Sequence, residues 1–343
     1  MSRISKTDRP RPSRRSVVIS GAGAAAALIA RPGLALSQGK RKNVTLTINF
    51  IPRGDFAFPY LARERGYYAE HGLEVTIKHV LGNAFAFQML SGNETHFVHA
   101  DLVQMLQLQG KTPEPWLRSL AIDTDKIPLS LFFIKGNGIS KPKDLEDRTI
   151  VDSPGSTTAP LLKLLAQANH FDEKKVKWKS AAANAKVAIM LQGQADAVSI
   201  YYPAFPSTAA KLPAGKELGV FNFGDYGVDI YGDGLITQER LWREQPSLVR
   251  AFVQATVKGA KDSYADPAAA ADAITKYHPE INRALAVKEM EIQRDANVGR
   301  NKLGLGYHDP AKMEATYHAV TDLIGQPIGR PVSDFYTNDA LKS

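Results

Sequence analysis

The chain has 343 residues, of which 44% are hydrophobic and 23% are charged, with 43 lysines and arginines against 35 aspartates and glutamates. It contains no cysteine, which excludes disulfides, thiolate metal sites, cysteine nucleophiles and a cysteine-linked lipid. A folded part of about 300 residues is too long for one small core and favours two lobes.

Residues 1–37 carry the features of an export signal. Arg14 and Arg15 precede an apolar run, 17–30, that is too short to span a bilayer and is followed by small residues. We expect a cleaved signal peptide. The paired arginines favour the twin-arginine route, although an ordinary basic segment for the general secretory route fits the same residues. The segment holds seven basic residues and one acidic residue, which is +6 of the net charge of +8, so we expect no nucleic-acid partner.

The next part of the chain alternates strand and helix patterns. Apolar spacing and turn residues predict strands at 44–48, 73–80 and 96–99, with helices at 59–70 and 85–90. This order predicts a mostly parallel sheet covered by helices.

A comparable pattern restarts after Gly138, which predicts a second, similar unit. Its expected strands are 147–152, 176–180 and 195–200, and its expected helices are 156–169 and 185–191. From Asp233 onwards the chain is mainly helical, with prolines marking the starts of helices at 246–265, 267–277 and 309–324. No second hydrophobic span follows the signal peptide, so we do not expect the mature chain to cross a membrane.

Several short segments resemble those of a known family and occur in the same order. Residues 66–75 fit the pattern G-[FY]-[FY]-x-x-x-G-L-x-V. The other matching segments are 48–62, 141–145, 153–157, 191–197, 232–235 and 246–252. Over nearly the whole mature chain, the sequence resembles ABC-transporter periplasmic solute-binding proteins of the thiamine-pyrimidine-precursor, sulfonate and nitrate type.

The resemblance implies an α/β fold of the type II periplasmic-binding kind, in which two lobes close by a hinge on a ligand in the cleft between them. It implies a lobe 1 at 43–134 plus 225–343 and a lobe 2 at 135–224. The expected function is that of the solute-binding subunit of an ABC importer, which captures a small organic solute and delivers it to the permease in the inner membrane. We expect a periplasmic monomer with no catalytic residue, no cofactor and no metal.

Ligand contacts in such folds are expected at the carboxyl ends of strands, where helix N-termini expose unpaired N–H groups. Segment 153–158 has this character, because its glycine lets the backbone approach a ligand while Ser156, Thr157 and Thr158 offer hydroxyls. An anionic or carbonyl group fits there, although a plain helix cap explains the same residues.

Aromatic residues gather at the other loops that the resemblance places at the cleft, where they would either stack on a flat ligand or pack in the core. The expected aromatic contacts are Phe50, Phe56, Phe58, Phe85, Tyr201, Tyr202 and Tyr231. The same loops add Pro52, Asn83 and Asp233 as ligand-binding candidates. Asp101 is either the N-cap of the following helix or a carboxylate of the cleft.

Departures from the family narrow the expected ligand. Pyrimidine-precursor binders have Asp-Trp and then His where this chain has Asn49, Phe50 and Phe56, and many relatives have Trp-Glu where it has Tyr201 and Tyr202. An aminopyrimidine would use a carboxylate partner, so it becomes a poorer fit. The sequence therefore favours a neutral or anionic ligand with an apolar or aromatic body, sulfonates included.

Two other classes of function occur on the same fold. A pyrimidine synthase on the same fold relies on a histidine in the first loop and on a cysteine-rich stretch, whereas this chain has Phe56 and no cysteine. A ligand-sensing module of a regulator would carry a helix-turn-helix or a transmembrane helix on the same chain, and neither is visible. Reversible binding of a small molecule that is returned unchanged would separate these classes.

Overall fold

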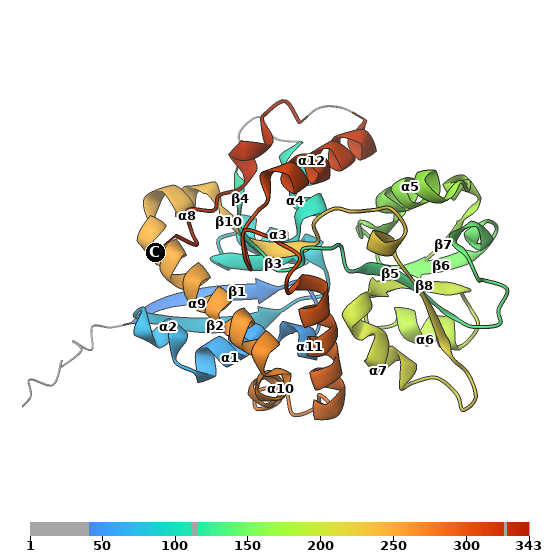
Figure 1. Cartoon of the computed structure of the whole chain (residues 1–343), viewed down its shortest axis with the longest axis horizontal. Helices are drawn as coiled ribbons and strands as arrows, with labels where there is room; N and C mark the ends of the chain where they lie inside the picture. The colour runs from blue at the N-terminus through green and yellow to red at the C-terminus, as the bar shows by residue number, and fades with distance from the viewer. Residues whose placement is uncertain (1–40, 111–115, 326–327, 343) are drawn as a thin grey trace, which may run out of the picture. The chain divides into compact units, whose positions relative to one another are not determined.

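The computed structural model describes residues 41–110, 116–325 and 328–342. The predicted signal peptide at 1–37 lies outside the described residues. The strands form two five-stranded sheets, each packed against helices (Figure 1). This arrangement agrees with the α/β class that the alternating patterns predicted.

The first sheet has the strand order β2-β1-β3-β10-β4. Its strands are β1 (Lys42–Ile48), β2 (Leu73–His79), β3 (Phe97–Asp101), β4 (Leu117–Ile122) and β10 (Asp233–Gln238). Strand β1 is parallel to β2 and β3, while β10 is antiparallel to β3 and β4. One strand of this sheet therefore returns from a point more than 100 residues further along the chain.

The second sheet has the order β7-β6-β8-β5-β9, which repeats the arrangement of the first. Its strands are β5 (Leu129–Ile134), β6 (Thr149–Asp152), β7 (Lys177–Ser180), β8 (Ala197–Tyr201) and β9 (Leu218–Asn222). Strand β5 is antiparallel to β8 and β9. We expected residues 129–134 in the first lobe, but they pair in the second sheet, so the chain crosses between the sheets before residue 129.

The repeated order gives each sheet equivalent strand ends. Strands β3 and β8 occupy the same position in their sheets, and they end at Asp101 and Tyr201. Strands β1 and β6 are likewise equivalent, and β6 ends at Asp152. Loops that follow equivalent strands therefore supply both halves of the site described below.

The predicted helix at 59–70 is two helices, α1 (Phe58–Glu64) and α2 (Tyr67–Glu70). Gly66 separates them with a φ of 77°, a left-handed conformation that a glycine adopts at little cost and that ends a helix. The other helices are α3 (Asn83–Ser91), α4 (Leu102–Gln109), α5 (Thr158–Asn169), α6 (Lys186–Leu191), α7 (Phe205–Ala209), α8 (Glu239–Glu244), α9 (Pro246–Ala265), α10 (Pro267–Thr275), α11 (Arg283–Asn297) and α12 (Pro310–Ile324).

Helix α11 was not predicted, and its buried face explains why. That face includes Glu289, Gln293 and Asn297, so the apolar spacing that marks an amphipathic helix is weak. By contrast, α9 buries an apolar stripe against the first sheet, where Phe252 stacks on Phe97 of β3 with ring centroids 3.9 Å apart. Among the residues that the structure describes, no helix has the length and apolar character needed to cross a membrane.

Candidate functional site

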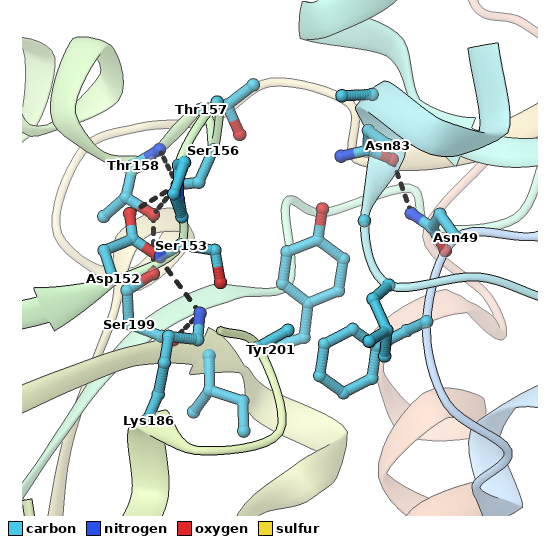
Figure 2. Close-up of a pocket in the computed structure, with 18 of the residues that line it drawn as sticks. Asn49, Asn83, Asp152, Ser153, Ser156, Thr157, Thr158, Lys186, Ser199 and Tyr201 are labelled. Atoms are coloured by element: carbon cyan, nitrogen blue, oxygen red, sulfur yellow. Dashed lines mark hydrogen bonds and ion pairs between the residues drawn. The ribbon is translucent and has the colours of Figure 1, made fainter. Parts of the chain in front are cut away.

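A cleft lies where loops from the two sheets meet, and it holds about 750 Å³ of empty space with its open mouth included. The lining comes mainly from the loops after β1 and β6, from the end of β8, from the start of α3 and from α6 (Figure 2). Seven of the predicted ligand-binding residues line it: Phe50, Asn83, Phe85, Ser156, Thr157, Thr158 and Tyr201.

One wall of the cleft is a turn rich in hydroxyl groups that leads from β6 into α5 (Figure 2). Gly155 has a φ of 72°, which lets the turn reverse direction without side-chain strain. Ser156 donates its hydroxyl proton to Asp152, and its Oγ accepts from the backbone N–H of Thr158 at 3.0 Å. The hydroxyl of Ser153 is buried and has no hydrogen-bond partner among the described residues. Ser153 therefore offers a free polar group beside the cleft.

A buried ion pair supports the same wall. Lys186 of α6 is only 6% exposed, and its ammonium donates to Asp152 Oδ1 at 3.1 Å and to the carbonyl oxygen of Ser199 at 2.7 Å. These bonds use two of the three ammonium protons, so one remains for a ligand. The sequence reasoning did not single out Lys186 or Asp152. Asp152 ends a predicted strand just before the glycine turn, which was the one available signal.

Two amide side chains lie on the opposite wall (Figure 2). Asn49, directly after β1, donates from Nδ2 to Asn83 Oδ1 at 2.7 Å. The same Asn83 oxygen accepts from the backbone N–H of Asp101 at 3.1 Å. Asn49 Oδ1 is buried without a partner among the described residues. This amide oxygen is a candidate acceptor for a hydrogen-bond donor on a ligand.

Aromatic side chains enclose the space between the two walls. Phe50 is half-buried, with the guanidinium of Arg53 lying 5.0 Å from its ring centroid, and Phe85 is 57% exposed. Arg53 also donates to both oxygens of Asp55, at 2.9 and 2.6 Å. Its charge is therefore neutralised inside the protein.

Tyr201 stands between the walls and joins the two halves of the site. Its hydroxyl lies 3.2 Å from Asp101 Oδ2 and 3.3 Å from Asp233 Oδ1, and both aspartates are 1% exposed. Burial, together with these two carboxylates, holds the pKa of Tyr201 well above its ordinary value. Asp101 also caps α4 by accepting from the N–H of Gln104 at 2.9 Å, so of the two roles predicted for this residue it has that of the N-cap.

The remaining predicted site residues do not line this cleft. Phe56 and Phe58 are 2% exposed, and both rings pack against His99 at 5.6 Å. Tyr231 is fully buried, and its hydroxyl accepts from the N–H of Asp309 at 2.8 Å. The others are Pro52, which belongs to the first loop, Tyr202, which borders a separate hollow, and Asp101 and Asp233, which lie behind Tyr201.

Comparison with protein families gives one match. The model of the family described as "NMT1/THI5 like" matches residues 53–270, which is more than half of the chain. The matched region contains most of the residues that form both walls of the cleft.

Two curated proteins are similar along most of their length. The riboflavin-binding protein RibY of Chloroflexus aurantiacus is 26% identical over 314 residues, which cover 88% of this chain and 87% of the relative. The formylaminopyrimidine-binding protein of Halalkalibacterium halodurans is 26% identical over 254 residues, which cover 73% of this chain and 74% of the relative.

Solved structures share the fold. The ligand-binding component of an ABC-type import system from Staphylococcus aureus, solved with zinc bound, superposes with a TM-score of 0.69 at 12% identity and covers 88% of this chain and 99% of its own. A desulfurization enzyme superposes with a TM-score of 0.59 at 14% identity and covers 88% and 98%. The expected two-lobed periplasmic-binding fold is confirmed, and the fold by itself is compatible with binding proteins and with an enzyme.

Proposed function

Because the chain belongs to the NMT1/THI5-like family, we propose that it is the extracytoplasmic solute-binding component of an ABC importer. The proposal is supported by the names of the two curated relatives, both of which are binding proteins. It is also supported by the cleft between the two sheets, which is lined by aromatic side chains and a few polar groups, as small-molecule sites are. The partner of the loaded protein would be a membrane permease.

The charge balance of the cleft favours an uncharged ligand. The lining contains two cationic side chains, and each has a carboxylate partner: Arg53 pairs with Asp55, and Lys186 pairs with Asp152. A bound anion would therefore compete with a buried carboxylate for each cation. A neutral ligand needs no such exchange, so we disfavour sulfonates and nitrate within the wider class that the sequence allowed.

The shape and polarity of the cleft favour a flat heteroaromatic ligand of the riboflavin type. Phe50 and Tyr201 offer ring faces for stacking, which contributes roughly 0.5–1.5 kcal/mol per pair beyond burial. Lys186 offers a donor on one wall and Asn49 an acceptor on the other. An uncharged ring with donors and acceptors along one edge would use both walls. This combination of an aromatic enclosure and neutralised cations is the observation that carries the proposal.

Titration with riboflavin tests this directly, because binding between aromatic side chains quenches flavin fluorescence. Formylaminopyrimidine, an alkanesulfonate and nitrate serve as competitors in a parallel thermal-shift series. We expect riboflavin to give the largest stabilisation, about 2.7 kcal/mol at 100 times its Kd. Stabilisation by the sulfonate or nitrate, with none by riboflavin, would contradict the proposed ligand class.

An enzyme is the second candidate function, since a desulfurization enzyme shares the fold. We propose that this chain performs no chemistry on its ligand. After long incubation and denaturation of the protein, chromatography of the released ligand should recover all of it unchanged. Conversion in proportion to the amount of protein would favour the enzyme.

The proposed cellular setting extends the same function. We propose export by the 1–37 signal, cleavage between residues 35 and 40, and a monomer with lobes divided between residues 122 and 129 and between residues 222 and 233. N-terminal sequencing of a periplasmic extract and light scattering at micromolar concentration test these points. Recovery of the intact chain from washed membranes, or a stable dimer alone, would contradict them.

A further inference from the structure

The two halves of the cleft meet at one tyrosine and two carboxylates. Tyr201 belongs to the second sheet, whereas Asp101 and Asp233 belong to the first. The phenol oxygen lies 3.2 Å from Asp101 Oδ2 and 3.3 Å from Asp233 Oδ1. A second bond between the halves runs from Thr157 Oγ1 to Asp101 Oδ2 at 3.2 Å. Opening the cleft must break these contacts.

The three oxygen atoms need more protons than the tyrosine supplies. A phenol has one proton and can donate it to one carboxylate. The phenol oxygen and the oxygen of the other carboxylate are then in contact with no proton between them. A proton lies between them if that second carboxyl group is itself protonated and donates to the phenol oxygen. The closed arrangement therefore requires one additional proton.

The hydrogen bonds identify which carboxyl group takes that proton. The ionised form of Asp101 is stabilised by hydrogen-bond donors, because Oδ1 accepts from the Gln104 N–H at 2.9 Å and Oδ2 accepts from the Thr157 hydroxyl. Among the residues that the structure describes, Asp233 receives only a long contact from Asn49 Nδ2 at 3.4 Å besides its contact with Tyr201. Burial disfavours an ionised carboxylate with so few donors, so Asp233 Oδ1 is the site of the proton.

The charged groups around Asp233 have opposing effects. His99 of β3 lies 3.9 Å away through Nδ1, and its Nε2 bonds to Asp123 at 2.7 Å. Burial raises the pKa of Asp233 to about 7, against the lowering effect of His99 and with further raising by Asp101 and Asp123. Arg53, from the loop after β1, also faces Asp233. From the second sheet, Tyr201 is the titratable group in contact.

We propose that closure of the two lobes takes up one proton, held between Asp233 and Tyr201, so that the protein closes more readily at acidic pH. This inference rests on the proposed function only in assuming that the lobes move apart. Opening hydrates Asp233 and returns its pKa toward the ordinary carboxyl range, so the open form binds fewer protons. The closed form is therefore favoured at acidic pH and loses stability as the pH rises from the ordinary carboxyl range to about 7. Within that range the ratio of closed to open protein should fall about tenfold per pH unit, and it should level off above pH 7.

The test measures closure in the purified chain with no ligand added. The chain has no cysteine, so introduced cysteines are the sole sites of labelling. The double variant Lys78→Cys/Lys177→Cys, changed at exposed positions on β2 and β7, is labelled with a dye pair for energy transfer. We expect the wild-type dye distance to increase between pH 5 and pH 7 and to change little above that. Asp233→Asn cannot ionise, so this variant should stay closed over the whole range. Asp272→Asn, the same change on an exposed helix, should behave like the wild type.

Two further results decide the inference. Tyr201→Phe removes the shared hydroxyl, so it should open the lobes at pH 6 and remove the pH dependence. This variant provides an independent measurement if Asp233→Asn fails to fold. A pH-independent wild type, or an Asp233→Asn variant that opens like the wild type, would overturn the inference. Failure of riboflavin to bind would leave these measurements unaffected, so the two proposals can fail separately.

Discussion

Each half of the cleft contains a buried carboxylate, and the two carboxylates differ in their bonding partners. Asp152, at the end of β6, receives Lys186 at 3.1 Å, the N–H of Ser153 at 2.8 Å and the hydroxyl of Ser156. Asp233, at the start of β10, has no cation within 3.5 Å in the described part of the chain and shares one phenol with Asp101. The half that contains Asp152, from the second sheet, thus holds a fixed charge pair that shapes a wall. The half that contains Asp233, from the first sheet, holds a carboxyl group whose charge can change.

The difference follows from what each loop provides. The turn after β6 contributes backbone N–H groups and hydroxyls at the start of α5, and α6 brings a lysine alongside. Asp233 lies within an antiparallel pair of strands, where its neighbours are Asp101 and a histidine already bound to Asp123. Strand ends in two similar sheets can therefore serve as a rigid support in one sheet and as a titrating contact in the other.

The largest effect is expected from breaking the fixed pair. Lys186→Met leaves Asp152 buried without a cation, which should lower the free energy of unfolding by about 3–5 kcal/mol. Urea denaturation at pH 7 measures this. The double variant Asp152→Asn/Lys186→Met should recover most of the loss, because no buried charge remains. Equal stability of the single and double variants would show that the pair is not the cause.

Removing the charge of Asp233 should have the opposite effect and raise the free energy of unfolding. The pKa of Asp233 is raised in the folded protein, so ionisation costs stability as the pH rises from the unfolded value toward about 7. Asp233→Asn should therefore gain stability relative to wild type by about 1.4 kcal/mol for each pH unit between 5 and 7. Melting curves at several pH values check this. A constant difference between the two proteins across that range would contradict it.

A smaller effect is expected at Thr157, which bonds from one half of the cleft to the other. Thr157→Val removes a hydrogen bond to a carboxylate, a loss of about 1.5–3 kcal/mol, so riboflavin should bind roughly ten- to a hundredfold more weakly. Calorimetry measures the affinity. Thr149→Val, on the same sheet with its side chain away from the cleft contacts, is the control and should bind like the parent.

The smallest effect is expected at Phe85, at the mouth of the cleft. Phe85→Ala removes a ring that is 57% exposed, so the free energy of unfolding should stay within about 0.5 kcal/mol of the parent. Affinity for riboflavin should fall by about 0.5–1.5 kcal/mol through lost stacking. Fluorescence titration measures the affinity, and melting curves measure the stability. A large loss of stability would place this ring in the core.

The sequence alone was sufficient to predict some of the local elements. Alternating apolar residues predicted β1 and β2, prolines marked the starts of α9 and α10, and the glycine turn after β6 predicted hydroxyls at the cleft. These features depend on neighbours in the chain, whose spacing is visible in the sequence. The family and the two-lobed fold followed from short segments in a fixed order.

Only the tertiary structure separated cleft from core and revealed the partners of the buried charges. Phe50 and Phe58 look alike in the sequence, yet Phe50 lines the cleft while Phe58 packs on His99, more than 40 residues away. In the sequence, Lys186 is one lysine in a short predicted helix. The fold places it beside Asp152 at the end of β6, where the two form an ion pair. Strand β5 pairs with strands more than 60 residues further along the chain. Burial and charge pairing depend on contacts between residues that are distant in sequence, and the spacing of apolar residues does not encode those contacts.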